Sequence, residues 1–364
     1  MIDPALATAI LSDPDDPAGY LVLADWLQTR GDPRGELIVL QHRDSDEAKE
    51  LLERHAETFL GRFATTKPDT FELEWKLGFI RSATIGWEMF AGEDDDDPSP
   101  AQLAAFLALP SARFLQKLAL GPTQHEDELM LDELAGPIED AAPPCLRELF
   151  LGSTSDWDIS GTSTRMPRST SMPRLQTLRL RGGWVSLDES IDLPQLRSFT
   201  VESGSLRPDA LQAIAAARWP ELESLEIWFG DPNYGAKGGV ADIASVLDGQ
   251  GLGKLRHLGL RNCAFADELV EALISSRVLA QLHTLDLSMG NLSDRGVATM
   301  LGEAARFSHL DKLDLDDNAL TTAQWPAARA LAKTVVYGNE HDPERAVPRT
   351  GERSRYWSYV SVGE

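Results

Sequence analysis

Cysteine is scarce in this chain, whose 364 residues include only Cys145 and Cys263. Stacked repeats of the kind described below would hold these two residues tens of ångströms apart, well beyond the ~5–6 Å between α-carbons that a disulfide requires. Two isolated cysteines also do not form a zinc site by themselves. We therefore expect reduced cysteines in the core, which favours the cytoplasm.

Long apolar runs and positive charge are also in short supply. No stretch of about 18 apolar residues is present to span a membrane, and the first residues, Met1 to Pro4, lack the basic start and apolar core of a signal peptide. The 58 acidic residues outnumber the 34 Lys and Arg, for a formal net charge of −24. This charge repels a phosphate backbone and no local basic patch offsets it, so we expect neither a nucleic acid nor a membrane as partner. The acidic balance favours solubility or attracts a basic protein surface, and the sequence leaves both interpretations open.

The motifs of common enzyme classes are missing as well. The chain contains no G-x-S-x-G elbow, no Walker-type phosphate loop and no G-x-G-x-x-G turn. Its seven histidines are scattered, and His125 with Glu126 lacks the second histidine of a zinc-protease helix. We therefore expect no enzyme activity, no metal and no cofactor.

One short pattern is present eight times between Leu115 and Leu315: an apolar residue, two variable residues, an apolar residue, one variable residue and an apolar residue. The apolar positions of the eight copies are Leu115-Leu118-Leu120, Leu146-Leu149-Leu151, Leu175-Leu178-Leu180, Leu196-Phe199-Val201, Leu222-Leu225-Ile227, Leu255-Leu258-Leu260, Leu282-Leu285-Leu287 and Leu310-Leu313-Leu315. Their first residues lie 21 to 33 residues apart, on average about 28. A period in this range predicts stacked units that bury their apolar faces against one another. Phe79 to Ile85 has a similar form and predicts an extra first strand.

Helices are predicted between the later strands, over 208–217, 240–247, 267–275, 294–305 and 323–333. A strand and a helix in about 28 residues resemble the ribonuclease-inhibitor-like leucine-rich repeats. Cys263 and Asn318 match the ninth-position residue of that family's motif, whereas Gly290 departs from it. The resemblance covers about residues 80–335 and implies an α/β solenoid with a parallel concave sheet and convex helices. It implies no particular partner.

Strand alternation sends the residues between the apolar positions to the concave sheet. Phe150 and Trp228 are expected there as exposed anchors, because aromatic residues are enriched in interfaces. Arg179 and Arg181 face glutamates of adjacent repeats and form either an ion-pair ladder or a binding patch. The acidic residues of the last repeats suit a basic partner protein. The predicted partner-binding residues are Phe150, Arg179, Arg181, Glu226, Trp228, His257, Arg261, Asp286, Asp314 and Asp316.

Four segments fall outside the repeat pattern. Residues 152–172 are rich in Ser, Thr, Gly and Pro and predict an insertion loop. This loop either becomes ordered when a partner binds, with Trp157 as its anchor, or is a tolerated insertion without a binding role. The run 93–98 holds four consecutive aspartates but lacks the ligand spacing of a calcium loop, which favours a solvated linker. Residues 335–338 predict a last short strand, and the alternating aromatic and apolar residues of 356–362 predict a terminal strand that caps this end.

Residues 1–70 differ from the repeats and predict four helices. The helices are expected at 4–11, from the turn at 13–17 to Arg30, from Pro33, and over 46–63, with Asp32 as an N-cap and Gly31 as a left-handed C-terminal residue. The segments 23–27 (LADWL) and 30–36 (RGDPRGE) resemble the repeat-companion domain, a small bacterial module that precedes repeats, over about residues 5–45. The segment 74–80 (EWKLGFI) resembles the usual link from that module into the repeats. The resemblance implies bacterial origin and repeat architecture, and no activity.

The charged residues of this block permit two interpretations. Asp25, Arg30 and Arg34 are catalytic if the block is an enzyme, or they tie helices together in a cap over the open end of the solenoid. We favour the cap, and we predict a helical cap over 1–70, a leucine-rich-repeat solenoid over 71–337 and a C-terminal cap over 338–364. The predicted function is non-catalytic protein recognition through the concave sheet and its rim loops, as an adaptor, a regulatory subunit or an inhibitor. The alternatives are an enzyme or enzyme subunit with its chemistry in the N-terminal block, and a structural spacer.

Overall fold

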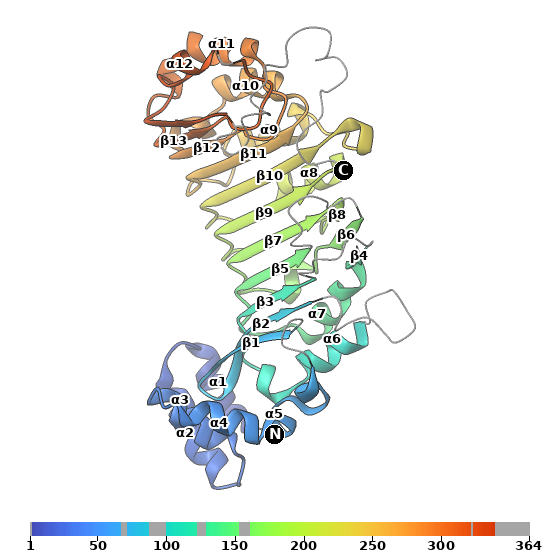
Figure 1. Ribbon diagram of the computed structural model, residues 1–364, viewed down its shortest axis with the longest axis vertical. Coiled ribbons are helices and arrows are strands. Elements are labelled where there is room, and N and C mark those ends of the chain that lie inside the picture. Colours follow the sequence, from blue (N-terminus) through green and yellow to red (C-terminus); the bar gives the residue numbers. More distant parts are fainter. Residues whose placement is uncertain are drawn as a thin grey trace.

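A long sheet dominates the computed structural model, which describes residues 2–66, 71–86, 100–121, 129–152, 161–321 and 323–338 (Figure 1). The strands of this sheet, in spatial order, are β1 (Phe71–Lys76), β2 (Phe79–Ile85), β3 (Lys117–Leu120), β5 (Glu148–Gly152), β7 (Thr177–Gly182), β9 (Ser198–Ser203), β10 (Ser224–Gly230), β11 (His257–Cys263), β12 (Thr284–Asp286), β13 (Lys312–Asp314) and β14 (Thr334–Val336). Only the first pair, β1 with β2, is antiparallel among these neighbours. The chain is therefore an α/β repeat solenoid with a long, mostly parallel sheet.

The register of the parallel strands follows the repeat pattern residue by residue. The middle apolar residue of each copy pairs with the middle residue of the next copy, along the row Ala83, Leu118, Leu149, Leu178, Phe199, Leu225, Leu258, Leu285, Leu313 and Val335. The first nine of these side chains are buried in one continuous core. Full burial of a leucine stabilises a fold by roughly 1.5–3 kcal/mol, so this row is a main source of cohesion. The predicted strands of the eight copies and the extra one over residues 79–85 are confirmed, and the last short strand is β14; the terminal strand predicted over 356–362 lies outside the described residues.

Helices cover the apolar face of the sheet and supply the other half of this core. They are α6 (Pro100–Leu107), α7 (Ala135–Ala141), α8 (Pro208–Ala216), α9 (Ala244–Leu247), α10 (Ala266–Ser275), α11 (Asp294–Gly302) and α12 (Trp325–Ala328). Leu103, Ile138, Leu211 and Leu269 are among the helix residues that pack with the strand leucines. Three predicted helices are shorter than expected: 240–247 begins as a 3-10 turn, 294–305 ends as α11 at Gly302, and 323–333 is reduced to α12. In the described residues, no helix is long and apolar enough to cross a membrane.

A second, smaller parallel sheet lies beside the first, in the order β4 (Leu129–Met130), β6 (Thr162–Arg165) and β8 (Trp184–Ser186). Strand β6 falls inside residues 152–172, so the prediction of an insertion loop over that whole segment is wrong. The polar run 162–165 gives no apolar alternation to indicate a strand, and its backbone hydrogen bonds to β4 and β8 make it one. Thr164 also donates its hydroxyl hydrogen bond to the carbonyl of Arg181, which ties the small sheet to the large one.

The N-terminal block contains α1 (Pro4–Ser12), α2 (Pro17–Gln28), α3 (Arg34–His42), α4 (Glu47–Arg54) and α5 (Ala56–Leu60). The side chains of Asp3 and Asp16 accept hydrogen bonds from the first turns of α1 and α2, and Gly31 has a φ of 70°, as predicted. The carboxylate of Asp32 accepts from the backbone N–H of Arg34 at 2.9 Å, which is the expected capping contact. The predicted helix over 46–63 is instead α4, α5 and a 3-10 turn.

This block packs against the starts of the first repeats (Figure 1). Tyr20 of α2 contacts the rings of Phe79 and Phe114, with centroids 5.9 and 5.7 Å away, and Cys145 joins the same apolar cluster. The turn between α1 and α2 lies along the strand starts, where Asp15 forms ion pairs with Arg81 and Arg147. The block is thus fastened to the solenoid by apolar and ionic contacts that span several repeats.

Candidate protein-binding face

The side of the large sheet opposite its helices carries the outward residues of the strands, and we call this side the open face. Phe150 and Arg179 lie there, on β5 and β7, with the Arg179 guanidinium 5.1 Å from the centroid of the Phe150 ring. Both side chains keep contact with solvent, since Phe150 is half-buried and Arg179 is 47% exposed. The sequence-based prediction placed both residues on this face.

A first group of charges is the Arg-Glu-Arg triad of Arg179, Glu202 and Arg181. Nε of Arg179 donates to Glu202 at 2.5 Å, and Nη1 of Arg181 lies 3.1 Å from the other oxygen of the same carboxylate. The predicted cross-strand ladder is therefore present here. Arg181 and Glu202 are buried, at 8% and 3% exposure, although the alternation of β7 predicted that Arg181 would be available to a partner.

Trp228 is not the exposed anchor that its position in β10 predicted. Its side chain is buried, with 7% of its surface exposed, and it packs with Met289 in a small apolar island separate from the main core. The guanidinium of Arg261 lies 4.7 Å from the indole centroid and that of Arg181 lies 6.0 Å from it. Alternation fixes the side of the sheet toward which Trp228 points, but neighbouring side chains cover it there.

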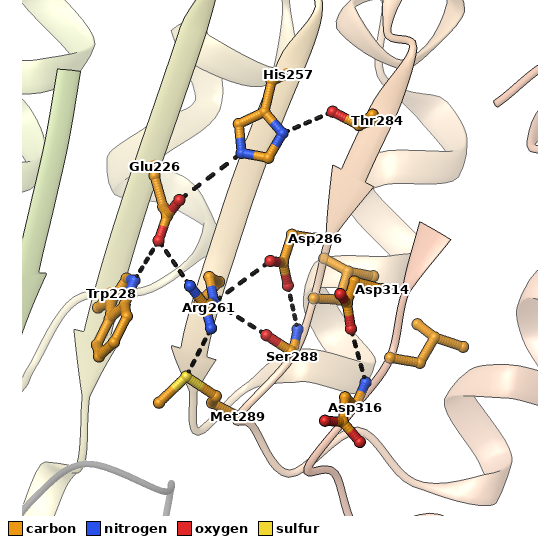
Figure 2. Close-up of polar contacts among 12 residues, drawn as sticks. Glu226, Trp228, His257, Arg261, Thr284, Asp286, Ser288, Met289, Asp314 and Asp316 are labelled. Carbon is orange, nitrogen blue, oxygen red and sulfur yellow. Dashed lines mark hydrogen bonds and ion pairs between the residues drawn. The ribbon is translucent and has the colours of Figure 1, made fainter. Parts of the chain in front are cut away.

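Glu226 is the centre of the polar contacts around Trp228 (Figure 2). Its Oε1 accepts hydrogen bonds from Nε1 of Trp228 at 2.7 Å and from Nη1 of Arg261 at 2.8 Å, and its Oε2 lies 3.8 Å from Nε2 of His257. Burial alone would raise the pKa of this carboxyl, but the hydrogen bonds from His257 and Trp228 and the charge of Arg261 outweigh burial and lower the pKa to about 2. The Glu226 carboxylate is therefore held ionised by the groups around it.

Arg261 links this carboxylate to the next strand and completes the Glu-Arg-Asp triad of Glu226, Arg261 and Asp286. Its Nε lies 3.4 Å from the carboxylate of Asp286 and donates to the hydroxyl of Ser288 at 2.9 Å (Figure 2). Burial works to lower the pKa of Arg261, yet the charges of Asp286 and Glu226 outweigh it and raise the pKa. On the neighbouring row, Nδ1 of His257 and the hydroxyl of Thr284 are 2.6 Å apart.

Gly259 creates the space that the Glu-Arg-Asp triad requires. It stands in the row between Glu226 and Asp286, and a β-carbon added to it would lie 2.8 Å from Cγ of Glu226. With no side chain at this position, Glu226 extends over β11 toward Arg261. Gly259 was not among the predicted site residues, although a glycine within a strand is a recognised sign of close approach.

The last strands of the open face are acidic. Lys312 pairs with Asp314 at 2.9 Å. The backbone N–H of Asp316 donates to the same Asp314 at 3.1 Å (Figure 2). One carboxylate oxygen of Asp316 is buried without a hydrogen-bond partner among the described residues. Burial and the neighbouring charges of Asp314 and Asp317 raise the pKa of Asp316. This end of the face thus carries negative charge that its own cations do not fully neutralise.

The other predicted site residues lie elsewhere. Trp157 and the acidic run 93–98 are outside the described residues. In the N-terminal block, Arg34 is buried between the rings of Phe59 and Phe79 and lies 3.5 Å from Asp32. The guanidinium of Arg30 stacks on the ring of Trp26, 3.7 Å from the ring centroid. The described segments contain no group of three or more His, Cys, Asp or Glu side chains placed to hold a metal ion.

Comparisons with known proteins identify a shared fold. No family model matches the chain, and neither does any curated protein. A crystal structure of a Bacteroides fragilis protein aligns with 80% of this chain and 81% of its own, at 20% sequence identity and a TM-score of 0.58. An internalin of Listeria monocytogenes aligns with 79% of this chain and 95% of its own, at 13% identity and a TM-score of 0.27. The first similarity shows that this solenoid fold occurs in another protein, and it extends to the fold alone.

Proposed function

We propose that this chain is a non-catalytic protein-recognition scaffold that binds a partner protein through the open face and the loops at its rim. In this proposal it is a bacterial, cytoplasmic leucine-rich-repeat protein, with residues 1–70 as a repeat-companion cap and residues 338–364 as a C-terminal cap. Its partner is another protein with a basic surface, and its role is that of an adaptor, a regulatory subunit or an inhibitor.

The observation that supports this function is the fixed arrangement of side chains on the open face. Glu226 accepts from two donors, and Arg261 contacts Glu226, Asp286 and Ser288 at once. Side chains that are already ordered lose little conformational entropy when a partner binds. Aromatic residues, Met and Arg are enriched in protein interfaces, and Trp228, Met289 and Arg261 lie together on this face.

The test is affinity capture from an extract of the native organism, with two matched double variants. Phe150→Ala/Arg179→Ala alters two solvent-accessible side chains of the open face, and Glu271→Ala/Arg277→Ala alters two exposed residues on the helix side. Circular dichroism first establishes that both variants are folded. We expect the wild type and the helix-side variant to capture the same amount of one partner. The open-face variant should capture at least about tenfold less of it, since a few residues dominate the binding energy of most interfaces. Equal retention by all three proteins would remove the open face as the binding site.

A further inference from the structure

Charge is distributed unevenly along the open face, and the two triads are opposite in composition. In the Arg-Glu-Arg triad one carboxylate is shared by two guanidiniums, which leaves a net charge of +1. In the Glu-Arg-Asp triad one guanidinium is shared by two carboxylates, which leaves a net charge of −1. The two triads occupy successive strands of the same sheet, β7 and β9 for the first and β10 to β12 for the second.

The apolar island lies between the two triads. The indole of Trp228 is within 6.0 Å of the Arg181 guanidinium on one side and 4.7 Å of the Arg261 guanidinium on the other, and Met289 packs against it. Met289 is itself half-buried, so the island reaches the surface through its side chain. Beyond the second triad, Asp316 adds a further carboxylate to this end of the face, and one of its oxygens is buried without a hydrogen-bond partner among the described residues.

From these contacts we infer that the open face binds a segment of its partner protein in one direction, with an acidic end over Arg179, an apolar centre over Trp228 and Met289, and a basic end over Asp314 and Asp316. This inference rests on the proposed function and specifies the chemistry of the partner. Complementary charge is the reason, because a like charge placed over either triad would be repelled while an opposite charge would be paired.

The spacing of the strands sets the length of such a segment. From β7 to β13 the sheet order has five steps, which at about 4.8 Å each separate Arg179 from Asp314 by roughly 24 Å. A partner segment would cover this distance with about 16 residues as a helix at 1.5 Å per residue, or with about seven residues as an extended strand.

Synthetic peptides test the direction of charge independently of the natural partner. The main probe has a glutamate block, a leucine-rich centre and a lysine block, made in the two lengths given above. One control peptide has the same composition with glutamate and lysine alternating, and a second control has lysine blocks at both ends. Affinity is measured by isothermal titration calorimetry at low and at physiological salt, since pairing of exposed charges weakens as salt rises.

We expect the wild type to bind the Glu–Lys peptide at least about tenfold more tightly than either control peptide. Arg179→Glu reverses the charge at the acidic-binding end, and we expect this variant to prefer the Lys–Lys peptide over the Glu–Lys peptide. Asp316→Asn should weaken binding of both lysine-containing block peptides by about threefold, and it provides a second test that does not depend on the folding of the first variant. Arg277→Glu, the same charge change at an 81% exposed position on the helix side, should leave all affinities unchanged.

Several results would overturn the inference. The inference is wrong if the wild type binds the block-charged and alternating peptides equally well. It is also wrong if the wild type binds the Glu–Lys and Lys–Lys peptides equally well, or if it does not bind the Glu–Lys peptide at all. Displacement of the probe by a peptide of residues 350–364 would assign the face to the chain's own C-terminal segment, and a dimer that the probe dissociates would assign it to a second copy. The proposed function is judged separately: if Phe150→Ala/Arg179→Ala still loses a captured partner while the peptides fail, only the charge direction is wrong.

Discussion

Replacing Glu226 with glutamine removes the carboxylate that joins Trp228, His257 and Arg261, and the effect on stability should depend on pH. The ordinary pKa of a glutamate side chain is 4.5, and that of Glu226 is lowered to about 2. A carboxyl whose pKa is lower in the folded than in the unfolded state stabilises the fold above its unfolded pKa and loses that contribution as the pH falls toward its folded pKa. At 1.36 kcal/mol per pKa unit, ionised Glu226 contributes about 3 kcal/mol at pH 6 and about 1.5 kcal/mol at pH 3.

The measurement is urea unfolding followed by far-ultraviolet circular dichroism, for the wild type and Glu226→Gln at several values between pH 6 and pH 3. We expect the wild type to be the more stable at pH 6, and the difference in unfolding free energy to shrink by about 2 kcal/mol on going to pH 3. Glu271→Gln, the same chemical change at an exposed position on α10, is measured alongside as the control for the substitution itself. A Glu226→Gln difference that is the same at both ends of the pH range would refute the reasoning.

Three further predictions concern other parts of the molecule. Asp15→Asn removes a half-exposed ion-pair partner of two arginines, so the unfolding free energy should fall by about 0.5–1 kcal/mol, and no change in the urea midpoint would contradict a fastening role. Cys145 and Cys263 are free and buried, and burial raises the pKa of both thiols, so Ellman's reagent should label them only after urea unfolding; rapid labelling of the native protein would show that the thiols are accessible. Gly230→Ala should cost about 3 kcal/mol or more, because φ is 91° there and a β-carbon would lie 1.9 Å from the Gly204 carbonyl oxygen; a thermal midpoint within a degree or two of the wild type would argue against this strain.

The apolar repeat predicts the solenoid because the burial of each strand's leucines depends only on the residues of that strand. Each strand must place its leucines on the covered face, and the spacing of Leu118 and Leu120 already shows this in a single copy. The ion pair of Arg179 with Glu202 was also predictable, since opposite charges occupied neighbouring copies of the pattern. In the same way, capping residues such as Asp16 marked helix starts from their own short stretches of sequence.

Contacts between outward side chains of different repeats were not predictable to the same degree. The burial of Trp228 depends on Met289 and Arg261, which reach it from later repeats, and the unequal repeat lengths leave these lateral distances undetermined. Strand β6 was missed because its residues 162–165 are polar and it exists through backbone pairing with two short strands. Gly259 leaves room for the side chain of Glu226, and this role depends on where that side chain lies. The sequence does not specify the position of the Glu226 side chain.

The fastening of the N-terminal block across several repeats has a consequence for folding during synthesis. Asp15 pairs with Arg147, 132 residues further along the chain, and the carbonyl of Leu11 accepts from Arg174, 163 residues further along. At about 5–20 residues per second, the ribosome adds these two partners roughly 7–33 s after Asp15 and Leu11 themselves. Until Phe114 and Cys145 have been made, the apolar side of Tyr20 and its neighbours lacks these two partners. The nascent chain therefore presents an exposed apolar surface, which is covered only once the third and fourth strands of the sheet, β3 and β5, have formed.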